Sequence, residues 1–236
     1  MIISGANALV TGANRGLGAA LVEGLLARGA GTVYAAARDP RTIGHLAAHK
    51  DPRVVPLRLD VTDLASIRAV AERADDVDLL VNNAGVSGAG SLLTADPERA
   101  RAEMETNFWG PVAMLRAFAP VLAARGGGAA VSVLSALSWA AMPAAGAYSA
   151  TKAAAWSFTN TARAELRDQG TLVVGVHLGF MDTDMVAHLD VPKVAAVDVA
   201  DRILDAVTAG EEEVLADGPA RALKEALAGP PKGLEI

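Results

Sequence analysis

The sequence predicts an α/β fold in which helices cover both faces of a parallel sheet. Short apolar runs alternate with longer amphipathic runs along the chain, and strands separated by helices need crossover connections, which make neighbouring strands parallel. Continuous apolar strands such as Leu79–Val81 suit a sheet that is buried on both faces. Because no linker, repeat or low-complexity stretch divides residues 1–236, we expect a single doubly wound domain with three layers and about seven strands.

The individual elements follow from the hydrophobic period and from the residues that interrupt it. Short runs rich in Val, Leu and Ala predict strands, in order, at Ala6–Val10, Thr32–Ala37, Val54–Leu59, Leu79–Asn82, Ala129–Leu134, Leu172–Val176 and Glu213–Ala216. Longer amphipathic patterns predict the helices between them, at Gly16–Arg28, Leu64–Ala74, Pro97–Thr106, Val112–Arg125, Tyr148–Arg167 and Val199–Ala209. A polar stretch, Pro40–His49, follows the second strand, and Asp217 before Pro219 predicts the start of a last amphipathic segment, Ala220–Ala228.

The composition argues against several classes of protein. Apolar residues make up 52% of the 236 residues and aromatic residues only 4%, so the core is large and its packing depends on Ala, Val, Leu and Gly. The net charge of −6, without a block of like charge, argues against a nucleic-acid partner. Without cysteine there is no disulfide and no thiolate metal site, and His45, His49 and His188 form no metal-ligand pattern.

The first residues and the hydropathy bear on localisation. Met1–Gly5 lacks the basic and apolar regions of a signal peptide, and charge, Gly and Pro interrupt every apolar stretch before it reaches membrane-spanning length. We therefore expect a cytoplasmic protein that has no membrane partner.

A glycine-rich turn directly follows the first predicted strand. Residues 11–18 read Thr-Gly-Ala-Asn-Arg-Gly-Leu-Gly, with glycines at 12, 16 and 18. Glycine lets the backbone turn sharply and come close to a ligand, and the helix that begins here directs free N–H groups and its positive dipole end to the same place. This position between strand and helix predicts a pyrophosphate site, and a turn that serves packing alone is the alternative.

Tyr148 and Lys152 lie one helical turn apart on the longest predicted helix. Residues i and i+4 share a helix face, so the phenol and the ammonium can point into one site. A phenol keeps its proton until a pH of about 10, and a positive charge nearby lowers that pKa. The pair therefore predicts a general acid or base that acts near neutral pH, although many such pairs are ordinary surface neighbours.

Three separated motifs together resemble those of the single-domain short-chain dehydrogenases/reductases. They are Thr-Gly-x-x-x-Gly-x-Gly at 11–18, Asn-Asn-Ala-Gly at 82–85 and Tyr-x-x-x-Lys at 148–152, and the resemblance runs from about Ala6 to Thr183. It implies a Rossmann fold, a nicotinamide dinucleotide as cofactor and a small-molecule carbonyl or alcohol as substrate. Asp60-Val61-Thr62 is similar to the family's adenine-contacting segment, Asn107 to its catalytic asparagine and Ser135, 13 residues before Tyr148, to its serine.

The resemblance also implies the role of each residue. Tyr148 exchanges a proton with the substrate oxygen, and Ser135 donates a hydrogen bond to that oxygen. Lys152 lowers the pKa of the tyrosine and binds the ribose hydroxyls, Asn107 holds a water of the proton relay, and the hydride comes from the cofactor. The residues expected to bind the cofactor are Gly12, Asn14, Arg15, Gly16, Leu17, Gly18, Arg38, Asp60, Val61, Asn82, Ala84, Gly85, Tyr148, Lys152, Gly179 and Thr183.

Some of these residues also have a purely structural interpretation. Ser132 and Ser138 lie close to Ser135, any of the three can cap a turn, and Ser138 is the fallback for the catalytic serine. Asn107 can be a helix cap or a buried amide that the core satisfies, and Asp60 can cap the helix that follows it.

Two asparagines and one histidine have mainly structural interpretations. Asn82 and Asn83 stand at a strand end, where backbone hydrogen bonding is as good an explanation as cofactor contact. His177 lies near the expected site, and we interpret it as structural because the Tyr–Lys pair makes a catalytic histidine unnecessary.

The end of the second strand bears on which nicotinamide cofactor is used. An enzyme that selects NAD places a carboxylate where it accepts hydrogen bonds from both ribose hydroxyls. Here Arg38 occupies the family's discriminating position and Arg15 lies in the turn, and two guanidinium groups suit a 2′-phosphate. We expect NADP(H) to be preferred and NAD(H) to be possible, because Asp39 offers a carboxylate one residue away, or pairs with Arg38 at the surface.

The segment after the sixth strand departs from the family pattern. Leu178 replaces the proline of Pro-Gly-x-x-x-Thr, while Gly179 and Thr183 keep their places, and the lid Asp184–Lys193 is short. A short lid predicts an open site or one that substrate contact completes. Apolar side chains around it predict a hydrophobic ketone or aldehyde as substrate, although Trp139 is also expected in a core or subunit contact. The residues expected to contact substrate are Ser135, Trp139, Met142, Tyr148, Phe180 and Met185.

The sequence therefore predicts an NADP(H)-dependent oxidoreductase similar to the carbonyl reductases. The helices at Val112–Arg125 and Tyr148–Arg167 resemble the family's subunit-pairing helices, which implies a homodimer or homotetramer. A catalytically silent dinucleotide sensor is the alternative, and the intact Tyr-Lys-Ser-Asn set argues against it. The glycine spacing disfavours an epimerase, and Lys152 disfavours the dehalogenases, which have arginine at that position.

Overall fold

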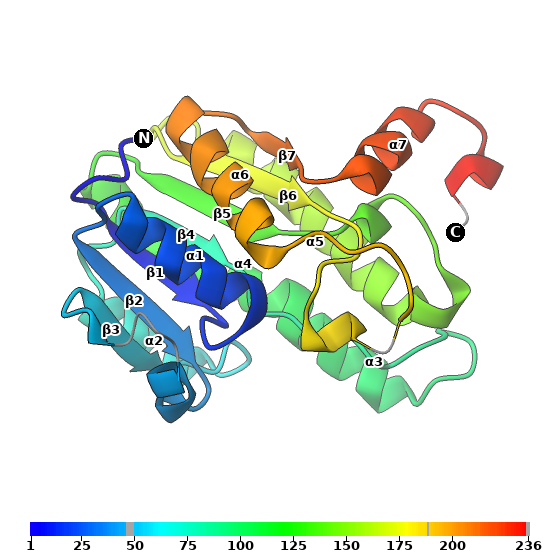
Figure 1. Ribbon diagram of the computed structural model, residues 1–236, viewed down its shortest axis with the longest axis horizontal. Coiled ribbons are helices and arrows are strands. Elements are labelled where there is room, and N and C mark those ends of the chain that lie inside the picture. Colours follow the sequence, from blue (N-terminus) through cyan, green and yellow to red (C-terminus); the bar gives the residue numbers. More distant parts are fainter. Residues whose placement is uncertain (46–49, 188, 235–236) are drawn as a thin grey trace.

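The computed structural model describes residues 1–45, 50–187 and 189–234. Its centre is a parallel sheet with the strand order β3-β2-β1-β4-β5-β6-β7 (Figure 1). The strands are β1 (Asn7–Thr11), β2 (Thr32–Ala37), β3 (Val54–Arg58), β4 (Leu79–Asn82), β5 (Ala129–Val133), β6 (Leu172–His177) and β7 (Glu213–Leu215). This order confirms the predicted doubly wound Rossmann fold, in which the chain builds outward from β1 and then from β4.

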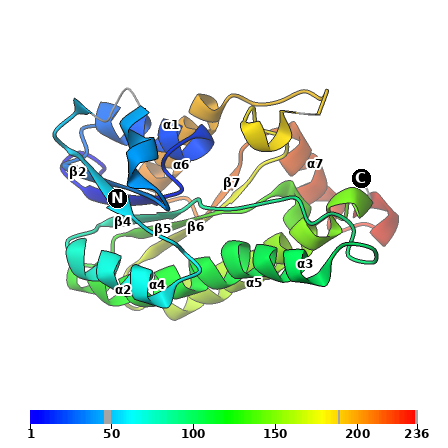
Figure 2. The same cartoon turned by 90° about the horizontal axis from the view of Figure 1, so that it is seen from below.

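Helices cover both faces of the sheet (Figure 2). The helices are α1 (Gly16–Ala27), α2 (Leu64–Arg73), α3 (Pro97–Met104), α4 (Gly110–Ala124), α5 (Gly146–Glu165), α6 (Ala196–Ala209) and α7 (Gly218–Ala226). Helices α1 and α6 lie on one face, and α2, α4 and α5 lie on the other, while α7 follows the edge strand β7. None of the helices within the described residues is both long enough and apolar enough to cross a membrane.

The strand pattern explains how two cores form on one sheet. Successive side chains of a strand point to opposite faces, so Ala8 and Val10 join the core under α1 and α6, while Leu9 joins the core under α2 and α4. In β4, Leu79 and Val81 face the first core and Leu80 the second. Continuous apolar strands are therefore buried on both faces, as the sequence predicts.

The predicted break between Thr106 and Val112 is wrong. Helix α3 runs into a wide π-turn, Glu105–Trp109, and α4 begins at Gly110 without an intervening loop. Gly110-Pro111 looks like a helix breaker in the sequence, but Pro111 stands in the first turn of α4 directly after the π-turn, whose wider backbone accommodates it. The π-turn therefore carries Asn107 inside one continuous helical rod.

Two predicted helix starts have different outcomes. Asp217 is the N-cap of α7 and accepts a hydrogen bond from the Ala220 N–H at 2.8 Å, which confirms that prediction. The N-cap of α2 is Asp63, which accepts from the Ala65 N–H at 2.9 Å, so the alternative that Asp60 caps this helix is wrong.

Candidate active site

The three glycines of the first turn are required by its geometry. Gly12 and Gly16 have φ angles of 64° and 53°, a left-handed backbone conformation that other residues rarely adopt. A Cβ atom on Gly12 would lie 3.0 Å from the Ala84 Cα, and one on Gly18 would lie 2.2 Å from the Gly12 carbonyl oxygen. The turn therefore brings the start of α1 against the end of β4, with its backbone close to any ligand above it.

Thr11 and Asn83 hold the ends of β1 and β4 together at this turn. The Thr11 hydroxyl accepts hydrogen bonds from the N–H groups of Asn83 and Ala84, both at 3.0 Å. The Asn83 amide donates to the carbonyl oxygens of Thr11 at 2.8 Å and Gly12 at 3.2 Å. The Asn83 side chain therefore makes the backbone hydrogen bonds expected of it, and the turn lies where the strand order reverses, the usual ligand position in such sheets.

Most other predicted cofactor residues line the same side of the molecule. Leu17 packs into the core, so it offers its backbone rather than its side chain. Val61 packs against Gly110 at the start of α4, and Asp60 accepts hydrogen bonds from the N–H and hydroxyl groups of Thr62 at 2.9 and 2.7 Å. Asn14 is half-buried at the turn.

Tyr148 and Lys152 face one another, as their spacing predicts. The Lys152 Nζ lies 5.6 Å from the centre of the Tyr148 ring and donates a hydrogen bond to the Val133 carbonyl at 2.8 Å. A Cβ atom on Gly85 would lie 3.3 Å from the Asn107 Oδ1 and 3.8 Å from the Lys152 Nζ. The motif at 82–85 therefore reaches the same site as the Tyr–Lys pair.

The direction of the Tyr148 pKa corrects the sequence-based expectation. Burial raises the pKa of Tyr148 to about 12, the Ser135 side chain opposes this rise, and the charge of Glu103 adds to it. Burial lowers the pKa of Lys152 to about 8. In the chain by itself the phenol therefore keeps its proton through neutral pH, and the predicted lowering by Lys152 is not found.

Glu103 is a neighbour of this site that the sequence analysis missed. It is buried on α3, where its Oε1 accepts a hydrogen bond from the Ala89 N–H at 2.7 Å and its Oε2 has no protein partner among the described residues. Its position four residues before Asn107, on the same helix face, was the available signal.

Ser135 lies beside Tyr148 at the end of β5 and caps a short 3-10 turn, Ala136–Ser138. Its Oγ accepts a hydrogen bond from the Leu137 N–H at 3.1 Å. The Ser138 hydroxyl accepts from the Ser135 N–H at 3.3 Å, so the fallback Ser138 is occupied as the second half of the capping box. Because Leu137 donates to Ser135 Oγ, the hydroxyl proton of Ser135 is left to point elsewhere.

Asn107 is held by the protein at both ends of its side chain. Its Oδ1 accepts from the Val86 N–H at 2.9 Å, and its Nδ2 donates to the Val86 carbonyl at 2.8 Å and to the Thr151 hydroxyl at 3.0 Å. These contacts fit the structural interpretation of this residue. A cavity of about 10 Å³, lined by Asn107, Lys152, Asn82 and Ser132 among others, has room for roughly one water molecule.

Arg38 lies in an open hollow at the ends of β2 and β3, together with Asp39, Arg41 and Arg58. Arg41 binds the Asp39 carboxylate through its Nε and Nη2 at 2.9 and 2.8 Å. The alternative in which Arg38 and Asp39 pair is therefore wrong. Arg58, two residues before Asp60 at the end of β3, is a second arginine of this hollow that the sequence analysis did not select.

Arg15 is not part of this hollow. Its Nη1 forms an exposed ion pair with the Asp184 Oδ2 at 2.9 Å, which joins the glycine turn to the lid. The expectation that Arg15 and Arg38 bind one phosphate therefore requires Arg15 to leave Asp184.

Gly179 and Thr183, just before the lid, contact different parts of the protein. The Gly179 N–H donates to the Asp217 Oδ2 at 2.6 Å, and a Cβ atom here would come 3.2 Å from both Asp217 and Pro219. Gly179 thus serves the packing of α7. The Thr183 methyl carbon lies 3.1 Å from the position that a Cβ of Gly16 would occupy, so Thr183 contacts the glycine turn.

One residue predicted to contact the substrate, Trp139, belongs to the core. Trp139 is buried, stacked on His177 at 3.7 Å between ring centres, and packed with Ala220 and Leu223 of α7, so it is a core residue and not a wall. Met142 and Phe180 are half-buried. The side chain of Met185 lies outside the part of the structure that is described. No group of His, Asp and Glu within the described residues could hold a metal ion.

Comparisons with known proteins agree with this geometry. The short chain dehydrogenase family matches residues 6–193. The short chain dehydrogenase pigC of Monascus ruber is 33% identical over 201 residues, which cover 80% of this chain and 66% of that protein. The NADP-dependent 3-hydroxy acid dehydrogenase of Schizosaccharomyces pombe is 30% identical over 237 residues, with 91% of this chain and 92% of that protein covered.

Solved structures extend the likeness to the whole fold. A short chain dehydrogenase from Burkholderia cenocepacia J2315 in complex with NADP is 42% identical, with a TM-score of 0.93 over 99% of this chain and 97% of that one. A short chain dehydrogenase/reductase from Burkholderia phymatum in complex with NAD has a TM-score of 0.86 at 24% identity over 97% and 96% of the two chains, which bears on the fold alone. The extent of these matches shows that the chain belongs to the short-chain dehydrogenase/reductase family of oxidoreductases.

Proposed function

We propose that the protein is an NADP(H)-dependent oxidoreductase that interconverts a hydrophobic ketone or aldehyde and its alcohol. The observation that carries the proposal is the convergence of Tyr148, Lys152 and Ser135 beside the glycine turn, where a bound nicotinamide dinucleotide would supply or accept a hydride.

The protein supplies the proton chemistry. Tyr148, protonated at neutral pH, donates its phenolic proton to the carbonyl oxygen during reduction. In the oxidation direction the phenol has to lose its proton first, and the phenolate then accepts the proton of the alcohol. The Ser135 hydroxyl donates a hydrogen bond to the same oxygen, and a well-placed donor of this kind stabilises the transition state by about 3–4 kcal/mol. The Lys152 ammonium binds the ribose hydroxyls. Asn107 borders a one-water cavity that also reaches Lys152, and this supports a water between these two side chains as part of a proton relay.

The hollow at the ends of β2 and β3 supports the NADP(H) preference. Asp39 is held by Arg41. Hydrogen bonds from Thr62 lower the pKa of Asp60, and the charges of Arg38 and Arg58 nearby add to this lowering. Two guanidinium groups here suit a 2′-phosphate, which accepts several charge-assisted hydrogen bonds. The NADP complex of the Burkholderia cenocepacia relative is in keeping with this preference.

A carbonyl panel and one variant test the proposal. Purified protein is assayed with NADPH and hydrophobic ketones, aldehydes and diketones, and turnover is read from the loss of nicotinamide absorbance. We expect Tyr148→Phe to lose nearly all turnover while it keeps NADPH binding. Two results together would favour the alternative function, a catalytically silent dinucleotide sensor: no carbonyl in the panel is reduced, and Tyr148→Phe leaves the function of the protein in the cell intact.

The assembly and location follow the same proposal. We expect one domain over residues 1–236, in a cytoplasmic homodimer or homotetramer that pairs through α4 and α5. An edge-to-face contact of Phe108 and Phe158, with ring centres 6.4 Å apart, joins the turn before α4 to α5, and Trp109 next to it is 52% exposed. Light scattering of the purified protein measures the number of subunits.

A further inference from the structure

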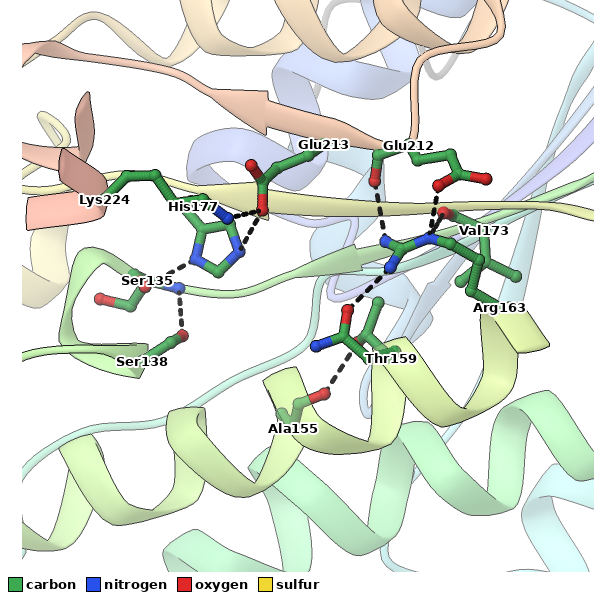
Figure 3. Close-up of polar contacts among 11 residues, drawn as sticks. Ser135, Ser138, Ala155, Thr159, Arg163, Val173, His177, Glu212, Glu213 and Lys224 are labelled. Carbon is green, nitrogen blue, oxygen red and sulfur yellow. Dashed lines mark hydrogen bonds and ion pairs between the residues drawn. The ribbon is translucent and has the colours of Figure 1, made fainter. Parts of the chain in front are cut away.

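A buried histidine contacts the backbone of the predicted catalytic serine. His177, at the end of β6, places its Nδ1 3.1 Å from the Ser135 carbonyl oxygen (Figure 3). A carbonyl oxygen only accepts hydrogen bonds, so Nδ1 carries the ring proton. Burial lowers the pKa of His177 to about 4, so the ring is neutral and its Nε2 is bare. The Ser138 N–H donates to the same carbonyl at 3.0 Å, so the Ser135 backbone is fixed from two sides.

The opposite edge of the ring faces an ion pair that comes from the end of the chain. The Glu213 Oε1 on β7 lies 4.0 Å from the His177 Nε2 and accepts a hydrogen bond from the Lys224 Nζ on α7 at 2.7 Å. A carboxylate beside a bare ring nitrogen is repulsive by itself, and the Lys224 ammonium offsets that repulsion. Figure 3 shows His177 between Ser135 on one side and this pair on the other.

The face of the ring is covered by Trp139. The two rings are 3.7 Å apart and inclined by 19°, and the Lys224 Nζ lies 5.0 Å from the centre of the Trp139 ring. The Trp139 Nε1 is buried without a hydrogen-bond partner among the described residues. An unsatisfied buried N–H group opposes folding, and such local conflicts are expected where a site has a function.

We infer that His177 is a positioning residue, which fixes Ser135 for proton transfer and is itself held by Trp139 and by the Glu213–Lys224 pair. The inference rests on the proposed function for the role of Ser135. It links the C-terminal helix α7 to Ser135 through three contacts, Lys224 with Glu213, Glu213 with His177 and His177 with Ser135.

Two substitutions separate the hydrogen bond from the packing. Asparagine carries an N–H donor near the position of the histidine Nδ1, whereas phenylalanine keeps a ring against Trp139 and has no donor. We expect His177→Phe to lower kcat by about 10- to 100-fold, the size of effect that a small misplacement of a reacting group produces. We expect the kcat of His177→Asn to stay within about threefold of wild type, because the asparagine N–H can still hold the Ser135 carbonyl in place. The Kd for NADPH should be unchanged in both.

A second readout does not depend on turnover. The Leu137 N–H donates to the Ser135 Oγ, so its amide hydrogen exchange, measured by NMR, reports whether that hydroxyl is in place. We expect faster exchange in His177→Phe and wild-type exchange in His177→Asn. Equal behaviour of the two variants in both kcat and exchange would overturn the inference, as would a parallel loss of NADPH binding.

A neighbouring ion pair provides the matched control. Glu212, one residue before Glu213, pairs with Arg163 of α5 at 3.4 Å and does not face the histidine. Lys224→Met leaves the Glu213 carboxylate unpaired beside the bare Nε2 of His177, so it should lower kcat and speed Leu137 exchange, whereas Glu212→Gln should change neither. Equal effects would contradict the link to α7. The comparison of these two variants also tests the inference if His177→Phe does not fold. If wild-type protein reduces no carbonyl, the proposed function fails, and Leu137 exchange still tests the positioning of Ser135.

Discussion

Arg41 holds the carboxylate of Asp39 through two guanidinium nitrogens, at 2.9 and 2.8 Å. Because the Asp39 carboxylate is bound by Arg41, two residues along the chain, it would not compete for the ribose hydroxyls of a bound cofactor. Its pKa is lowered, mainly by the hydrogen bonds from Arg41, so it stays ionised and paired. The hollow therefore presents Arg38 and Arg58 to a ligand as its remaining cations.

Arg38→Ala and Arg58→Ala should each weaken the use of NADPH. A hydrogen bond to a charged group contributes about 1.5–3 kcal/mol, which corresponds to a drop of about 10- to 100-fold in kcat/KM for NADPH. The value for NADH should stay within about twofold, since NADH has no 2′-phosphate. Steady-state kinetics with both cofactors measure this, with Arg68→Ala on the exposed face of α2 as the control. Equal or better efficiency of the wild type with NADH would contradict the preference.

Asp184→Asn should tighten NADPH binding. Asp184 holds Arg15 in an exposed ion pair, and its removal frees this arginine for the cofactor phosphate. We expect a several-fold lower Kd at low salt that disappears at high salt, because exposed charges are screened over a Debye length of about 10 Å at 0.1 M. Isothermal titration at two salt concentrations measures the effect. Asp182→Asn, two residues before the lid, is the control, and weaker binding in Asp184→Asn would refute the competition.

Gly18→Ala should destabilise the protein more than Gly5→Ala. The new methyl group at residue 18 would lie 2.2 Å from the Gly12 carbonyl oxygen, whereas the one at residue 5 meets nothing within 4 Å. Gly5→Ala is left with the strain of a φ angle of 78°, about 1–2 kcal/mol. Gly18→Ala adds displacement of the glycine turn, so we expect a loss of about 3 kcal/mol or more in stability and, if the turn binds the cofactor as proposed, a loss of NADPH binding. Urea unfolding and cofactor titration measure both, and similar losses would contradict the steric argument.

Lys152 should make stability rise with pH in the alkaline range. Its pKa is lowered to about 8 in the folded chain, and that of an unfolded lysine is about 10.4. Between these values the unfolded chain binds more protons, so the free energy of unfolding increases with pH, by on the order of 3 kcal/mol in all. Below pH 8 the full cost of burying the ammonium is present.

Lys152→Met tests this pH dependence. Urea unfolding of wild type and variant from pH 7.5 to 10 should give a stability difference that moves in favour of the wild type as the pH rises. Lys232→Met, which removes an exposed lysine outside the lid, should show no such trend. A pH-independent difference between wild type and Lys152→Met would mean that burial does not lower the pKa of this lysine.

Most of the fold could be predicted because each strand is a short apolar run between helix signals. Strands β2 and β4 have the predicted limits, and the glycine turn and the i, i+4 pair are local patterns that the backbone geometry converts directly into position. The path through Glu105–Trp109 could not be predicted, because Gly110-Pro111 breaks most helices and only the wide turn makes it acceptable.

The parts of the site that sequence missed depend on contacts between distant elements. Arg58 meets Arg38 because β3 pairs with β2 in a register that puts Arg58 opposite Ala37. Arg15 lies beside Asp184 only because the lid folds over the turn. The direction of the Tyr148 pKa depends on how deeply the phenol is buried, and spacing along one helix carries no information about depth.

The π-turn at Glu105–Trp109 sets the rotational phase of α4 relative to α3. The π-turn holds one residue more than a turn of α-helix, so deleting Thr106 and closing the turn into α-helix would leave Met114, Phe118 and Leu122 facing the sheet. Deleting a residue within α4, ahead of these three, would instead rotate them by roughly 100°. A single-residue deletion within α4 should therefore be far more harmful than the deletion of Thr106, and the π-turn is where mutational drift is most free to alter the length of this rod.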